Sequence, residues 1–204
     1  MKRLVVIFII ILLNVMSYSS DFIPRSEHRA MLEPLGLVVN GAGQSPDAFA
    51  NYWNVIGENH KPIVYMYYVG LKGVQQCWAM GLKWDLMKYF DNFVIPQIGL
   101  SITYDGNPSL HYEDEVAAGL HDGAIYNFLD GLEQLAFPVY LRIGYEFNGL
   151  GWNGYQPKTY KQAFIRIVQK IRERDLEIAA VWCSSADGET NFMDYYPGDE
   201  FVDW

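Results

Sequence analysis

Continuous apolar runs alternate along the chain with segments in which apolar residues recur about every four positions. Five of the runs have the length of a strand and little internal polarity, which is typical of strands buried on both faces. Because helices cover the faces of a parallel sheet, this alternation predicts an α/β protein with parallel strands. The predicted strands lie at 35–40, 62–70, 93–102, 137–146 and 177–185.

The segments between the runs predict a helix after each of the first four strands. Ser45-Pro46-Asp47 is typical of a capped helix start, and Pro157 predicts the start of another. Residues 75–91 and 113–135 carry apolar side chains at four-residue steps, so one long helix is predicted over each. The side chains expected to face the core are Trp78, Leu82, Leu86, Phe90, Val116, Leu120, Ala124, Phe128, Leu132, Tyr160, Phe164, Ile167 and Ile171.

Two architectures fit this order of elements: an open doubly wound sheet and a closed barrel of eight strands. An open nucleotide-binding sheet usually has a glycine-rich turn after its first strand. Here the turn is Asn40-Gly41-Ala42-Gly43-Gln44, which offers two glycines but no third and no lysine. We interpret it as a plain loop, and we expect a (β/α)8 TIM-barrel type fold of which about the first five βα units are present.

The composition excludes one class of partner. The chain has 204 residues, of which half are hydrophobic and 16% aromatic, so a sizeable core is expected. Its formal net charge of −9 lacks the basic surface of a nucleic-acid binder, and no nucleic-acid partner is expected.

The N-terminus has the layout of a secretory signal peptide. Lys2 and Arg3 precede an apolar run at 4–16, and Ser17 and Ser19 suit cleavage after Ser19. We expect a signal peptide at 1–19, a single barrel domain at 20–204, and secretion to an extracellular or periplasmic location. The run is too short to span a bilayer comfortably, so no stable membrane insertion is expected after cleavage; an uncleaved anchor is the alternative.

Cysteine and metal-ligand patterns add little. Cys77 and Cys183 could pair in an oxidising compartment, and the spacing leaves this open. Two isolated thiols do not predict a zinc site, and no cofactor is expected.

The fourth apolar run ends in RIGYEFNG, at 142–149. Strand alternation up to Glu146 would place Tyr140, Arg142, Gly144 and Glu146 inside a barrel and Leu141, Ile143 and Tyr145 against helices. Glu146 would then lie at the carboxyl end of a strand, where barrel enzymes hold their catalytic groups. A structural ion pair with Arg142 is the alternative.

Aromatic neighbours suggest what such a carboxyl could do. Tyr145, Phe147 and Trp152 would partly desolvate Glu146, and burial favours the protonated form of a carboxyl. Cleavage of a glycosidic bond uses two carboxyls, one of them a proton donor of this kind. Other rings at the carboxyl ends of strands could line a sugar-binding cleft, with core packing as the alternative: Tyr68, Tyr104, Trp152 and Trp182.

The C-terminal third of the sequence resembles glycoside hydrolase family 26, a β-mannanase-like family of retaining (β/α)8 barrels. The motifs that carry the resemblance are LRIGYEFNG at 141–149, Trp152-Asn153-Gly154, AVWCSS at 180–185 and YYPGDEFVDW at 195–204. The resemblance implies that Glu146 is the general acid/base, with Arg142 supporting it and Asn148 among the substrate-binding residues. Tyr145 and Phe147 stand where the family most often has His and Met, so the choice of polysaccharide stays open.

The resemblance also implies a nucleophilic Glu at a seventh strand, beyond Trp204. Glu113, Glu115 and Glu133 are expected on a helix surface in solvent and are not candidates. The expected function is hydrolysis of a β-linked polysaccharide, β-mannan or a related β-glucan or xylan, by a retaining two-carboxylate mechanism, with residues 1–204 inactive by themselves. The alternatives are a non-catalytic carbohydrate-binding barrel and an open-sheet binder of small molecules.

Overall fold

The computed structural model describes the chain apart from residues 1–29, 35–37, 88–93, 105–106 and 187–189. The expected signal peptide at 1–19 and the start of the first expected strand lie outside the described residues. Within the described residues, no helix is long and apolar enough to cross a membrane.

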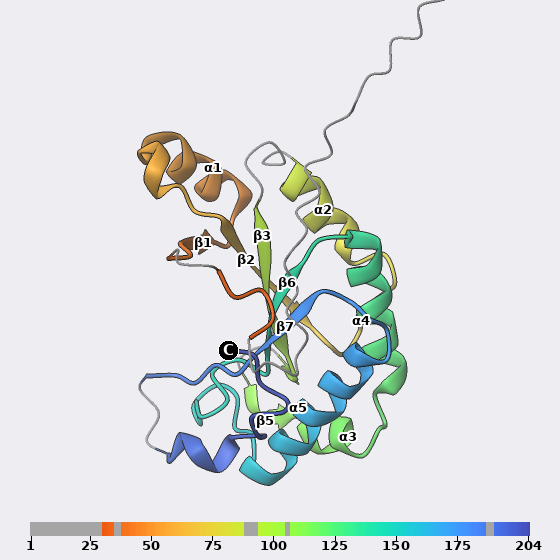
Figure 1. The fold of residues 1–204 in the computed structure, drawn as a ribbon. Helices are drawn as coiled ribbons and strands as arrows, with labels where there is room; N and C mark the ends of the chain where they lie inside the picture. The colour runs from red at the N-terminus through yellow and green to blue at the C-terminus, as the bar shows by residue number, and fades with distance from the viewer. Residues whose placement is uncertain (1–29, 35–37, 88–93, 105–106, 187–189) are drawn as a thin grey trace, which may run out of the picture.

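The described residues form one five-stranded sheet whose strands follow one another in chain order (Figure 1). Its members, in spatial order, are β1 (Gly41–Gly43), β2 (Val64–Gly70), β3 (Ile95–Ser101), β6 (Val139–Ile143) and β7 (Ile178–Val181). Every neighbouring pair is parallel. A doubly wound sheet reverses its strand order at a switch point, whereas a barrel adds each unit beside the last. The sheet therefore confirms the incomplete barrel and excludes the open-sheet alternative as its architecture.

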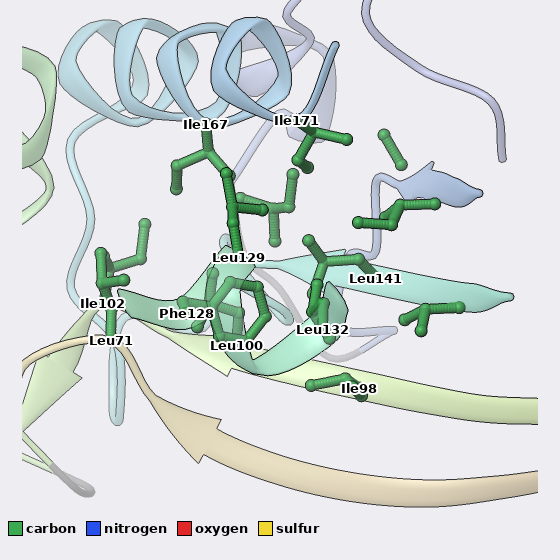
Figure 2. Packing of buried hydrophobic residues seen from close by; sticks show 14 of the residues in the cluster. Leu71, Ile98, Leu100, Ile102, Phe128, Leu129, Leu132, Leu141, Ile167 and Ile171 are labelled. Carbon is green, nitrogen blue, oxygen red and sulfur yellow. The ribbon is translucent and has the colours of Figure 1, made fainter. Parts of the chain in front are cut away.

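Helices follow the strands as expected, with one further break. They are α1 (Pro46–Val55), α2 (Ala79–Met87), α3 (Glu113–Ala117), α4 (Asp122–Leu135) and α5 (Pro157–Arg172), with short 3-10 turns η2 (Glu58–His60) and η4 (Phe192–Tyr195). Figure 1 shows α2, α4 and α5 along the same side of the sheet. Figure 2 shows the core between these layers. Leu129 and Leu132 of α4 and Ile167 and Ile171 of α5 point toward the sheet, where they join Ile98 and Leu100 of β3 and Leu141 of β6.

The structure corrects the strand expected at 35–40 and the helix expected at 113–135. The described part of 35–40 holds no strand; β1 begins at Gly41, in the stretch expected to be a loop. An added Cβ at Gly41 would lie 3.2 Å from Cβ of Val64, so the missing side chain lets β1 approach β2 closely. The single helix expected over 113–135 is two helices, because Gly119 has a φ of 85° that ends the first. Leu120, expected in the core, is 74% exposed in this break.

A short antiparallel hairpin was missed altogether. It pairs β4 (Thr103–Tyr104) with β5 (Asn107–His111), directly after β3. Both strands are short, and β5 is mostly exposed, so neither carries the apolar run that marks the other strands. The hairpin lies at the carboxyl end of β3, on the face where a barrel places its site.

Candidate active site

Arg142 lies on the inner face of β6, the side of the sheet opposite the helices. Its register partner on β3 is Gly99, whose partner on β2 is Tyr68. A Cβ at position 99 would lie 2.7 Å from Cδ1 of Tyr68, so this space is available only because residue 99 is glycine. The Tyr68 ring occupies that space, and the Tyr68 hydroxyl accepts a hydrogen bond of 3.4 Å from Nη1 of Arg142.

The backbone turns immediately after β6, and this changes which side chains face inward. β6 ends at Ile143, and Gly144 has a φ of 53°, a left-handed conformation that interrupts strand alternation. A Cβ on Gly144 would lie 2.8 Å from the Tyr160 ring, so this position faces the helices. The expectation that Gly144 faces inward and Tyr145 outward was therefore wrong. The Tyr145 ring lies inside, with its centroid 5.0 Å from that of Tyr68 and 5.3 Å from Cζ of Arg142.

Glu146 is held on the loop that follows rather than on the strand itself. It is a non-glycine residue with a φ of 53°, a conformation that costs free energy and persists where neighbours enforce it. The Glu146 N–H donates to the Cys183 carbonyl at 2.7 Å. The buried Asn153 amide donates to the carbonyls of Tyr145 and Glu146 at 2.8 and 3.0 Å. These bonds fix the loop from both sides.

The carboxylate of Glu146 faces Arg142 and solvent. Its Oε1 lies 3.9 Å from Nη2 of Arg142, and the Glu146 side chain is 38% exposed. Three aromatic side chains were expected around Glu146, but Phe147 is not one of them. Phe147 points away from the carboxylate and is fully buried in the core. The Phe147 ring stacks on Trp182 with centroids 4.8 Å apart and packs on Tyr195.

Trp182 accordingly sits on the helix side, where it packs between Phe147 and Tyr196, and this matches the core-packing alternative. The next residue, Cys183, faces inward instead. Its Sγ accepts a hydrogen bond of 3.1 Å from Nη2 of Arg142. Sequence reasoning missed Cys183, although alternation from Trp182 was a signal that could have found it. Both Cys183 and the exposed Cys77 are free thiols, so the disulfide left open by the sequence is not formed.

Asn148 connects the loop of Glu146 to the segment after β7. Its side-chain amide donates to the Ser185 carbonyl at 3.1 Å and accepts from the Ser185 N–H at 2.6 Å. Asn148 is buried, so both polar atoms of its side chain serve the backbone. The structure thus places this residue as a brace beneath the loop.

The remaining predicted aromatic residues lie at the carboxyl ends of the strands and reach solvent. Trp152 is 37% exposed and Tyr104 is 44% exposed. Tyr104 borders a pocket of about 440 Å³ at the ends of β2 and β4, together with Lys72, Trp78 and Tyr112. The Lys72 ammonium lies 4.8 Å from the Tyr104 ring centroid, and a hydrogen bond to Tyr104 raises the pKa of Lys72.

The charge of Arg142 is preserved in spite of its burial. Burial acts to lower its pKa, but the contacts with Cys183 and Tyr68 outweigh this, and the net effect raises the pKa of Arg142 above its ordinary value. A permanent cation therefore stands beside Glu146. Among the described residues, no group of three or more His, Cys, Asp or Glu side chains is arranged to hold a metal ion.

Glu113 was expected in solvent, and this expectation was wrong. It is completely buried at the start of α3. Its Oε1 accepts from the Gln156 N–H at 2.8 Å and from the Thr159 hydroxyl at 3.0 Å, and its Oε2 lies 2.6 Å from Nδ1 of His111. Glu113 thereby satisfies free donors at the start of α5. A carboxylate with three such partners is a structural cap joining α3 to α5.

The parallel strands lie in chain order, as they do in a (β/α)8 barrel. Glu146 lies beside the buried Arg142 at the carboxyl ends of these strands, where barrel enzymes have their active sites. A match to a protein family agrees with this barrel class and makes it more specific. The model of glycosyl hydrolase family 26 matches residues 59–204, and the chain belongs to that family.

Relatives of this chain include two curated β-1,3-xylanases. One, from an Alcaligenes species, is 36% identical over 96 residues, which is 44% of this chain and 20% of the relative. The other, TXYA from a Vibrio species, is 27% identical over 178 residues, which is 83% of this chain and 37% of the relative. The chain thus spans well under half the length of these two relatives.

A solved structure supports the fold. It is a β-mannanase from a symbiotic protist of the termite Reticulitermes speratus, complexed with a gluco-manno-oligosaccharide. The TM-score is 0.60 at 17% identity, over 81% of this chain and 62% of that one.

Proposed function

We propose that this protein is a glycoside hydrolase that cleaves a β-linked polysaccharide with retention of configuration, and that Glu146 is its general acid/base. The observation that carries the proposal is the way Glu146 is held. Its backbone is kept in a left-handed conformation by bonds to Cys183 and Asn153, while its carboxylate reaches solvent beside Arg142. Such enforced strain is concentrated at functional sites.

In the first step a nucleophilic carboxylate attacks the anomeric carbon as the bond to the leaving oxygen breaks, and that oxygen takes the proton of Glu146. In the second step the Glu146 carboxylate removes a proton from water. The water oxygen then attacks the same carbon and releases the nucleophile. The nucleophile is proposed to be a Glu beyond Trp204, as the family resemblance implies. Arg142 provides a fixed positive charge beside Glu146 when Glu146 is ionised.

The comparisons narrow the substrates worth testing. Two relatives are named β-1,3-xylanases, and the matched solved structure is a β-mannanase with a bound gluco-manno-oligosaccharide. We therefore propose β-1,3-xylan and β-mannan as the first substrates, with other β-glucans and xylans as comparisons. The exposed rings of Trp152 and Tyr104 are suited to stack on sugar residues.

The test is Glu146→Gln in the full-length protein, with Glu200→Gln at an exposed position as the matched control. Activity on polysaccharide should fall by about two to four orders of magnitude, the range for loss of a positioned acid or base. An aryl glycoside with a good leaving group needs no proton in the first step, so its glycosyl–enzyme intermediate should accumulate. Azide should then restore turnover, because azide attacks that intermediate without base assistance.

Other outcomes would contradict the proposal. Equal losses on both substrates, with a lowered melting temperature and no effect of azide, would show Glu146 to be a structural partner of Arg142. Binding of oligosaccharides by the unmodified full-length protein without hydrolysis would favour the non-catalytic carbohydrate-binding barrel.

We also propose export, on the basis of the charged start, the apolar run at 4–16 and the serines before residue 20. N-terminal sequencing of exported protein should find Ser20 or a residue close to it as the first residue. An intact Met1 on exported protein would instead indicate an uncleaved anchor.

A further inference from the structure

One nitrogen of Arg142 faces two acceptors. Nη2 lies 3.1 Å from Sγ of Cys183 and 3.9 Å from Oε1 of Glu146. The first distance is a hydrogen bond to sulfur, whereas the second is too long for a hydrogen bond between nitrogen and oxygen. In this arrangement the guanidinium donates to the thiol and stands off from the carboxylate.

Cys183 also binds Glu146, the second residue of the Arg142–Glu146 pair. Its main-chain carbonyl accepts the Glu146 N–H at 2.7 Å, and two residues further on Ser185 is bonded twice to Asn148. The segment after β7 therefore fixes the loop of Glu146 through the backbone and the Arg142 guanidinium through a side chain. Cys183 thus contacts both charged residues, Arg142 through its sulfur and Glu146 through its main-chain carbonyl.

This separation has a chemical consequence. A direct hydrogen bond from a guanidinium to a carboxylate is charge-assisted, and it strongly favours the ionised carboxyl. An acid catalyst must instead carry its proton into the reaction. A thiol is a weak acceptor, so it can occupy Nη2 without adding a full charge to the site.

We propose that Cys183 is a positioning residue whose sulfur holds the Arg142 guanidinium back from Glu146, so that Glu146 keeps a transferable proton. This inference rests on the proposed role of Glu146 as the acid/base. It assigns Cys183 no contact with the substrate.

Among the described residues, the other side chains that contact the Arg142 guanidinium do so at Nη1 or through a ring face. From β2, the Tyr68 hydroxyl and the Met66 sulfur both accept from the opposite nitrogen, Nη1, at 3.4 and 3.6 Å. From the loop after β6, Tyr145 presents its ring to the guanidinium. From β3, Gly99 presents no side chain. Loss of the Cys183 sulfur therefore frees Nη2, which already lies 3.9 Å from Glu146 Oε1.

The experiment compares Cys183→Ala and Cys183→Val, which lack an acceptor, with Cys183→Ser, which keeps one. Cys77→Ala at an exposed cysteine is the control. The pH profile of kcat/KM on polysaccharide is measured in the full-length protein for each. In the Ala and Val variants the high-pH limb should move to lower pH by about one unit or more, the size of effect expected from a close opposite charge. The Ser variant should keep the limb near its original position, and Cys77→Ala should not move it.

A second readout does not depend on activity. The Glu146 carboxyl is titrated by carbon-detected NMR in protein labelled at glutamate, with its signal identified by its loss in Glu146→Gln. Its midpoint should move to lower pH in the Ala and Val variants, in the same direction as the kinetic limb. An unfolded Ala variant would leave the Val variant, which preserves more side-chain volume, to decide.

The outcomes separate this inference from the proposed function. An unmodified protein that does not hydrolyse polysaccharide contradicts the proposed function, while the titration still tests the position of Arg142. A midpoint that stays in place, or moves to higher pH, in folded variants overturns the role of Cys183, whatever their melting temperatures.

Discussion

Gly99 lies beside Arg142 in the register of β3 and β6, and the space left by its missing side chain is filled by the ring of Tyr68. Through this space Tyr68 reaches across one strand to bond Arg142. On the inner face of the sheet, the rings of Tyr68 and Tyr145 therefore pack over Gly99, beside the guanidinium of Arg142. Two expectations follow from contacts in this site, and a third concerns an ion pair between α4 and α5.

Gly99→Ala should destabilise the protein by about 1–3 kcal/mol, the usual cost of overpacking a filled space. The new methyl group would lie 2.7 Å from the Tyr68 ring and 3.0 Å from Cδ1 of Tyr145, so both rings must move. Urea unfolding measures the change. The control is Gly81→Ala in α2, where an added Cβ meets nothing within 4 Å. Helix propensity should make that variant more stable by about 0.5–1 kcal/mol. Equal effects at the two positions would contradict the packing described for Gly99.

Asn148→Ala should cost about 1–3 kcal/mol, because the half-buried N–H and carbonyl of Ser185 each lose the hydrogen bond that they make to the Asn148 side chain. The same change should loosen the loop of Glu146, so proteolysis within 144–149 should become faster under native conditions. Asn127→Ala is the comparison, since that amide makes a single long hydrogen bond of 3.5 Å to Val74. A loss no larger than that of Asn127→Ala would show that the brace does not stabilise the loop.

Asp122 and Arg166 predict a pH-dependent contribution to stability. Two hydrogen bonds from Arg166, each 2.6 Å, hold the pKa of Asp122 below its ordinary value of 3.8. A lowered folded-state pKa stabilises the protein above the unfolded value, and the contribution is lost as the pH falls through the folded value. Asp122→Asn should therefore lower the free energy of unfolding by about 0.5–1 kcal/mol near neutral pH, since the pair is partly exposed.

The measurement is urea unfolding of the two proteins at neutral pH and in strong acid. The difference between them should disappear at the acid end, and added salt should reduce it at neutral pH. Glu173→Gln, which removes a more exposed pair with Lys170, is the control and should change stability less. A difference that persists in strong acid would attribute the loss to packing rather than charge.

Much of the framework was predictable from local sequence. The strands at 62–70, 93–102 and 177–185 contain β2, β3 and β7, and Pro157 is the first residue of α5. The four side chains expected inward on α5 are buried: Tyr160, Phe164, Ile167 and Ile171. Periodicity sufficed here because the apolar residues of a buried strand or an amphipathic helix recur at regular short intervals along the chain.

For the candidate site, the sequence was enough to identify Glu146, whereas the arrangement of the residues around it required the tertiary structure. The motif at 141–149 identified Glu146 and Arg142, and the structure places them 3.9 Å apart at their closest charged atoms. It did not identify Cys183, which lies 41 positions from Arg142 in the chain and meets it through pairing of β6 with β7. Nor did it show that Glu113 is a buried cap, since its partners at Gln156 and Thr159 come from a different helix.

The sequence by itself determined that the strands are parallel and buried, that helices cover them, and that a carboxylate follows the fourth buried run. Only the tertiary structure decided which way the side chains after that run point. Strand alternation holds while the backbone stays extended, and the left-handed turn at Gly144 reverses it, so Tyr145 lies inside. That turn is supported by the Leu100 carbonyl of a neighbouring strand, and Glu146 by the Cys183 carbonyl of another. Partners so distant in the chain leave no periodic signal, because their contact exists only once the sheet has formed.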